Sequence, residues 1–178
     1  MKKLLAFAGS NSSTSINHKL VQSVVTDISD CEVTLIKLTD YLLPIFSEDI
    51  EKESGHPEIL SDLLDLIKSH DGCIMSVNEH NGSVSAFFKN TLDWLSRIEY
   101  KFLAGKKVVV LSTSPGKRGA LSALEYTTSV LPRYDAELIG QLAVPSFGEN
   151  FDSSTGRISN DAISQELQEI LHSLIQSL

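Results

Sequence analysis

Two runs in this chain, Cys73–Met75 and Val108–Leu111, are apolar at every position. A strand of this kind is covered on both faces, which is typical of a parallel sheet lying between two layers of helices. Apolar strand-like runs alternate with segments of helical periodicity from one end of the chain to the other. The sequence therefore predicts an α/β fold in which right-handed crossovers join parallel strands.

The alternation predicts five strands separated by helices. Apolar side chains recur at helical spacing in segments 20–28, 59–67, 88–97, 121–131 and 163–178, and Asn160 or Asp161 is placed to cap the last helix. Five strands with a polar loop after the first favour the flavodoxin-like order 2-1-3-4-5, with three layers and helices on both faces of the sheet. The predicted strands are Lys3–Ala8, Glu32–Lys37, Gly72–Val77, Lys106–Leu111 and Glu137–Val144.

Two long stretches, Thr39–Pro57 and Pro145–Asn160, show no regular pattern and are expected to be irregular. Loops of this length are uncommon unless they serve as lids or partner contacts.

Composition narrows the classes of protein to which the chain can belong. With 178 residues, 42% of them hydrophobic, residues 1–178 are expected to form a single domain with a full core. The net charge of -8 and the scattered lysines and arginines leave no basic stripe for nucleic acid.

No apolar stretch is long enough to span a membrane, and the run Leu4–Ala8 is too short for a signal peptide. The two cysteines form no CxxC motif, so a reducing, cytoplasmic location is expected.

Three loops rich in glycine, hydroxyl and amide residues follow three of the predicted strands. They span residues 9–17, 76–83 and 112–119. The carboxyl ends of parallel strands meet at one edge of the sheet, where open α/β folds bind ligands. These loops therefore predict a pocket for a phosphorylated planar ligand.

The first loop reads Gly-Ser-Asn-Ser-Ser-Thr-Ser-Ile-Asn, without GxGxxG or Gly-Lys-Ser/Thr. This argues against a dinucleotide Rossmann domain and a P-loop NTPase. Hydroxyl groups and backbone amides at the start of a helix can hold a phosphate dianion without lysine or arginine. Helix capping is the alternative, but it accounts for one of the five hydroxyl residues better than for all of them. The loop is therefore predicted to bind phosphate.

Neither a metal site nor a side-chain catalytic constellation is indicated. The histidines lack HxH and HExxH spacing, and no GxSxG elbow occurs. His80 has no nucleophile to pair with, and Glu79 is expected to accept backbone N–H bonds within its own loop.

These loops also resemble a known family. Gly9-Ser10 with Ser15-Ile16-Asn17, the loop 79–83 followed by Lys-Asn-x-x-Asp-Trp at 89–94, and Ser114-Pro115-Gly116 with Gly119 are similar to the NAD(P)H-dependent FMN reductases. This flavodoxin-like family includes chromate and quinone reductases, and the resemblance covers nearly the whole chain. It implies a bound FMN, NADPH or NADH as electron donor, and a small-molecule electron acceptor. It also implies a homodimer or homotetramer in which helices 88–97 and 121–131 lie at the interface.

The resemblance implies FMN-binding residues in all three loops and no catalytic side chain, since the flavin carries the chemistry. A bulky residue at Gly82 or Gly119 is expected to weaken FMN binding while leaving folding intact. Loss of Ser15 and Asn17 is expected to weaken binding of FMN far more than that of riboflavin. The implied phosphate-binding residues are Ser10, Ser12, Ser15 and Asn17, and Ile16 between them is a further implied FMN-binding residue. Those around the flavin ring are Glu79, His80, Asn81, Gly82, Ser83, Ser114, Pro115, Gly116 and Gly119.

The chain departs from the family pattern at two informative positions. Ser12 stands where the family usually has arginine, and His80 stands where a tyrosine would lie along the flavin. Loss of the arginine removes a charge-assisted hydrogen bond of about 1.5–3 kcal/mol, from either the FMN phosphate or NADPH. Two alternatives stay open: a flavodoxin-type electron carrier, and a binding module that keeps the fold without flavin.

Overall fold

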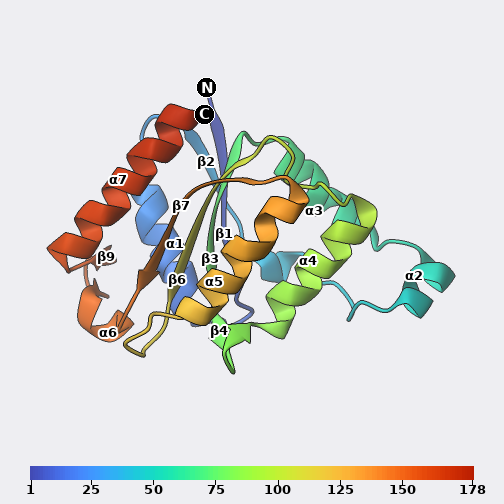
Figure 1. The fold of residues 1–178 in the computed structure, drawn as a ribbon, viewed down its shortest axis with the longest axis horizontal. Helices are drawn as coiled ribbons and strands as arrows, with labels where there is room; N and C mark the ends of the chain where they lie inside the picture. The colour runs from blue at the N-terminus through green and yellow to red at the C-terminus, as the bar shows by residue number, and fades with distance from the viewer.

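The computed structural model describes residues 1–178 and has three layers, with a central sheet between two layers of helices (Figure 1). Five parallel strands pair in the order β2-β1-β3-β6-β7, which is 2-1-3-4-5 when only these strands are numbered. The predicted flavodoxin-like topology is therefore confirmed. The strands are β1 (Lys3–Ala8), β2 (Glu32–Leu35), β3 (Gly72–Val77), β6 (Lys107–Thr113) and β7 (Glu137–Val144).

Helices cover both faces of this sheet. α1 (Ile16–Thr26) and α7 (Asp161–Ser177) pack on one face, and α3 (Glu58–Lys68), α4 (Ala86–Ile98) and α5 (Leu121–Val130) pack on the other (Figure 1). Successive residues of a strand point to opposite faces, so Leu4 and Ala6 join the α1–α7 core while Leu5 and Phe7 join the core under α3, α4 and α5. This explains why the central strands are apolar at nearly every position.

The two stretches that were expected to be irregular contain short elements, so that expectation was wrong in part. The first holds η1 (Leu38–Asp40) and α2 (Glu48–Ser54), and the second holds α6 (Phe147–Asn150) and a hairpin of β8 (Phe151–Asp152) and β9 (Arg157–Ile158). The Ser47 side chain accepts a hydrogen bond from the Asp49 amide and caps α2. Acidic residues in the first turn of α2 favour its positive end, although none of its residues is buried.

Both chain termini lie together at the amino edge of the sheet (Figure 1). The loops after β1, β3 and β6 lie at the opposite, carboxyl edge. α5 continues into η2 (Leu131–Tyr134), which leads to β7. No helix has the length and apolar character needed to cross a bilayer.

Candidate functional site

Buried hydrogen bonds fix the first loop against β3 and β6. The Asn17 side-chain amide donates to the Thr113 carbonyl (3.1 Å), and its Oδ1 accepts from the Ser76 hydroxyl (2.7 Å) and the Thr113 amide (3.0 Å). The Gly9 amide donates to the Ser76 carbonyl (2.8 Å), and the Ser85 hydroxyl donates to the Gly9 carbonyl (2.9 Å). These bonds hold the loop where β1 and β3 are neighbours, which is the topological switch point of this fold.

The first loop has an ordered internal structure. The Ser15 hydroxyl accepts from the His18 amide (3.1 Å) and so caps α1. The Ser12 hydroxyl accepts from the Thr14 amide (3.2 Å), and the Ser12 carbonyl accepts from the Ser15 amide (3.2 Å). The Ser12 amide in turn donates to the Ser10 hydroxyl (3.2 Å). Capping therefore accounts for Ser15, while Ser10, Ser12 and Thr14 shape the loop.

Several donors of this loop have no protein acceptor. The backbone amides of Ser10, Asn11 and Ser13 and the hydroxyl of Ser13 donate to no protein atom. Residues 10–15 border a cavity of about 660 Å³ whose other walls are His18, Lys19 and Gln22 of α1 and the segment 37–40. Free amides and hydroxyls beside the positive end of an 11-residue helix suit a phosphate dianion. The residues present therefore fit a phosphorylated ligand.

The second loop folds as a hairpin of β4 (Glu79–His80) and β5 (Ser83–Val84). The two residues between the strands, Asn81 and Gly82, have φ angles of 52° and 78°. Two consecutive positive φ angles are what a type I′ hairpin turn requires, and asparagine and glycine are the residues that adopt them most readily. His80, Asn81 and Ser83 border a second cavity of about 540 Å³, together with Val84, Ala86, Lys89 and Tyr126.

Glu79 connects this hairpin to α5. Its Oε2 accepts from the backbone amides of Ser122 (2.9 Å) and Ala123 (3.3 Å) in the first turn of the helix. The N-cap residue of α5 is Ala120, which offers no side-chain acceptor. Glu79 accepts backbone N–H bonds as expected, but the donors belong to α5 and not to its own loop. The carboxylate therefore caps a helix from a separate element.

In the third loop, Gly119 lies close to the backbone of Val144 and Pro145. Its φ is 60°, and a Cβ there would lie 2.8 Å from the carbonyl carbon and oxygen of Val144 and 2.9 Å from the nitrogen of Pro145. The expectation that a bulky residue at Gly119 leaves folding intact was therefore wrong. At Gly82 a Cβ would meet nothing within 4 Å. Ser114 is half-buried, and Pro115 and Gly116 are exposed.

The structure thus gathers Ser10, Ser12 and Ser15 around one cavity and His80, Asn81 and Ser83 around another. Ile16, Asn17 and the third loop border neither cavity. Thr113 lies in the predicted third loop but is not among the binding residues named from the sequence. A polar residue at the end of an apolar strand was the available signal, because such a residue needs a buried partner.

Burial perturbs the pKa values of two titratable groups, His18 in α1 and Cys73 in β3. Burial, together with the positive charge of Lys37, lowers the pKa of His18 below its usual value. Burial raises the pKa of the Cys73 thiol to about 12, so this cysteine is no redox thiol at neutral pH. Asn78 Oδ1 is the one buried side-chain polar atom without a hydrogen-bond partner, while its Nδ2 lies 3.2 Å from His80 Nε2. No group of three or more His, Cys, Asp or Glu side chains could hold a metal ion.

Known proteins share this sequence pattern and fold. Residues 2–149 match the model of a family described as NADPH-dependent FMN reductase. A quinone reductase of Escherichia coli is 29% identical over 123 residues, which is 64% of this chain and 65% of the relative. An NAD(P)H-dependent FMN reductase of Pseudomonas aeruginosa is 26% identical over 174 residues, 97% of this chain and 92% of the relative. The structure of the flavoenzyme NAD(P)H:(acceptor) oxidoreductase of Paracoccus denitrificans has a TM-score of 0.81 at 23% identity, covering 99% and 96% of the two chains.

Proposed function

This chain belongs to the NADPH-dependent FMN reductase family, and from that premise we propose that it is an FMN-dependent NAD(P)H oxidoreductase. The observation that carries the proposal is the first loop, where free amides and hydroxyls border a cavity at the switch point of the sheet. The hydroxyls of Ser10 and Ser12 and the free amides of residues 10, 11 and 13 bind the FMN phosphate. Asn17 and Ser15 hold the loop in place.

The other two loops frame the flavin ring in this proposal. His80, Asn81, Gly82 and Ser83 of the hairpin lie along one side, and Ser114–Gly116 lie along the other. FMN held there would supply the redox chemistry, namely hydride acceptance from NADPH or NADH and electron transfer to a small acceptor such as a quinone. The side chains position the ring and need not act as acids or bases.

We further propose that the chain forms a homodimer through α4 and α5. The cavity beside the hairpin has Ala86 and Lys89 of α4 and Tyr126 of α5 in its wall. A second copy packed on these helices covers that opening and excludes water from the flavin. Light scattering coupled to size-exclusion chromatography tests this: a dimer mass supports the proposal, and a monomer mass at all concentrations contradicts it.

The visible spectrum of the FMN-supplemented protein, recorded without oxygen, tests the oxidoreductase function. A flavin band that is perturbed by the protein and bleaches on addition of NADPH or NADH is expected. A perturbed band that does not bleach indicates an electron carrier, and a free-flavin spectrum throughout contradicts FMN binding. The same additions to FMN without protein serve as the control.

A further inference from the structure

The positive charges of this protein are distributed unevenly. Of its 15 lysines and arginines, nine form ion pairs with acidic residues, and Lys106 donates to backbone carbonyls. Four of the remaining cations lie at the carboxyl edge of the sheet, in α1, after β2 and in the third loop. In a chain of net charge -8, unpaired positive charge thus gathers near the proposed site. The cations without an acidic partner are Lys19, Lys37, Lys117, Arg118 and Arg133.

Two of these cations border the cavity of the first loop. Lys19 belongs to the first turn of α1, and Lys37 immediately precedes η1 on the β2 side. The hydroxyl-bearing residues 12–15 border the same cavity. The field of Lys37 reaches His18 in the same wall, where it helps to lower the pKa of the imidazole and keep it neutral. Asp40 is the single acidic residue of the lining, so the cavity keeps an excess of positive charge.

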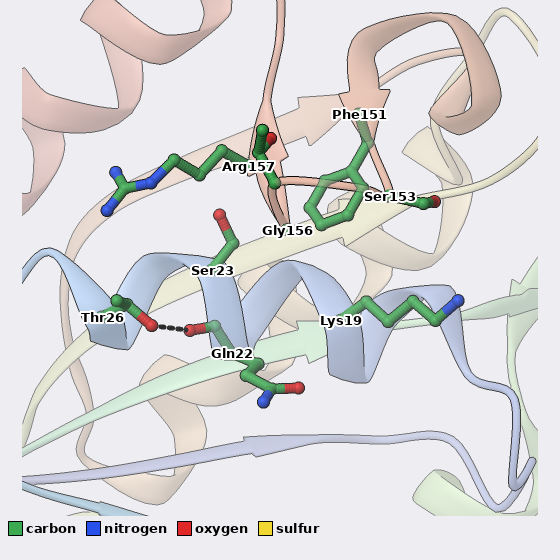
Figure 2. Close-up of a pocket in the computed structure, with 9 residues that line it drawn as sticks. Lys19, Gln22, Ser23, Thr26, Phe151, Ser153, Gly156 and Arg157 are labelled. Carbon is green, nitrogen blue, oxygen red and sulfur yellow. Dashed lines mark hydrogen bonds between the residues drawn. The ribbon is translucent and has the colours of Figure 1, made fainter.

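Lys19 also borders a smaller cavity of about 320 Å³ between α1 and the β8–β9 hairpin (Figure 2). In that cavity Arg157 donates to Asp27 at 2.6 Å and is neutralised. Figure 2 shows the Lys19 and Arg157 side chains extending in opposite directions. Cα–Cβ bonds of a helix tilt towards its N-terminus, so Lys19 leans towards the first loop. Its charge therefore lies on the side of the first-loop cavity.

We propose that Lys19 and Lys37 form, with the first loop, a subsite for a phosphate monoester dianion. These lysines supply from neighbouring elements a positive charge that the hydroxyl and amide residues of the loop do not carry. The subsite rests on the proposed function, and two ligands of that function carry the group: FMN has a 5′-phosphate and NADPH has a 2′-phosphate. An ammonium group on each side of a dianion gives charge-assisted hydrogen bonds, which are the stronger class.

Calorimetric titration of two ligand pairs tests this assignment, because the members of each pair differ only in the phosphate. FMN is compared with riboflavin and NADPH with NADH, in wild type, Lys19→Gln and Lys37→Gln. We expect each substitution to raise the dissociation constant of one phosphorylated ligand about tenfold and to leave its unphosphorylated counterpart within about twofold. A selective loss for FMN identifies the 5′-phosphate as the ligand, and a selective loss for NADPH identifies the 2′-phosphate.

Two further variants serve as controls. Asp40→Asn removes the one negative charge of the lining and is expected to tighten binding of the same ligand. Arg133→Gln removes an unpaired cation of η2, outside the cavity, and is expected to change neither pair. Circular dichroism confirms that each variant is folded.

The outcomes separate the subsite from the proposed function. If wild type binds FMN and NADPH but neither lysine variant changes the ratio within a pair, the subsite is overturned and the proposed function stands. An equal loss for both members of a pair also overturns it, since the phosphate is then not what the lysines recognise. Failure of wild type to bind FMN and NADPH overturns both.

Discussion

The Asn17 side chain uses three of its hydrogen-bonding positions on the protein, and it is only 3% exposed. Asn17→Ala leaves the Ser76 hydroxyl and both backbone groups of Thr113 without partners. Each unsatisfied buried group costs about 1–3 kcal/mol, so we expect the free energy of unfolding to fall by about 3 kcal/mol or more. Urea denaturation measures this loss.

Ser15→Ala is the matched comparison, because it removes the cap of the same helix and is expected to cost about 1 kcal/mol. Equal losses in the two variants would contradict the bridging role of Asn17. The ratio of FMN affinity to riboflavin affinity should therefore be measured in Ser15→Ala. In a double variant that includes Asn17→Ala, the loss of stability would obscure the effect on binding.

His18 makes folding stability depend on pH. Burial and the Lys37 charge lower its pKa in the folded protein, whereas the unfolded chain titrates near the ordinary value of about 6.5. The unfolded state thus binds the extra proton first, so stability is full above this value and falls as the pH drops below it. As the pH drops from about 7.5 to about 5.5, we expect the melting temperature of wild type to fall more than that of His18→Gln. Parallel curves for the two proteins would show that His18 does not carry this linkage.

At the scale of elements, the β4–β5 hairpin and α5 are held together by one carboxylate. Glu79→Ala leaves the first turn of α5 without its acceptor and is expected to reduce the free energy of unfolding by about 1–2 kcal/mol. Glu79→Gln keeps an oxygen acceptor and loses only the charge, so its loss is expected to be smaller. Hydrogen exchange at the Ser122 and Ala123 amides provides the local readout, and unchanged protection in Glu79→Ala would contradict the capping role.

Substitutions at two glycines with positive φ distinguish the cost of a left-handed backbone conformation from the cost of a steric clash. Gly82→Ala meets no atom and is expected to cost about 1 kcal/mol, the penalty of the left-handed conformation. Gly119→Ala carries that penalty and also forces its Cβ against the backbone of Val144 and Pro145. Its expected loss is therefore at least about twice as large by urea denaturation. A smaller loss at Gly119 than at Gly82 would contradict the packing argument.

The strands were predictable to within two residues because continuous apolar runs report burial on both faces. The short elements were not, because tertiary contacts stabilise them. The segment before α2 is fixed by α4, where Asn90 Oδ1 accepts from the Phe46 amide (2.8 Å) and Trp94 Nε1 donates to the Pro44 carbonyl (2.7 Å). Partners more than 40 positions apart leave no periodic signal in the intervening sequence.

At the scale of the whole molecule, the sequence places three polar loops at one edge of the sheet but does not show which cations stay unpaired there. The pairing of Arg157 with Asp27 spans 130 positions, and that of Lys68 with Glu99 joins α3 to the residue after α4. Only when all such ion pairs are known does it become clear that Lys37 has no acidic partner and contributes its charge to the cavity of the first loop. The loops were therefore readable from the residues alone, whereas the electrostatics of the site required the fold.

The two buried thiols are expected to react through different openings of the sheet. Cys73 is fully buried in the central strand β3 with a pKa of about 12, and Cys31 is 8% exposed beside β2 at the edge of the sheet. A thiol reagent reacts with thiolate, so Cys73 reacts only when the whole sheet opens, while Cys31 is exposed by fraying of the edge strand. We expect mass spectrometry to find Cys31 modified first and Cys73 modified in proportion to the unfolded fraction. Since a ligand of the native state lowers that fraction, FMN at about 100 times its dissociation constant should slow Cys73 modification about a hundredfold. Modification of Cys73 that FMN does not slow would mean that β3 opens locally, without loss of the loops that bind the cofactor.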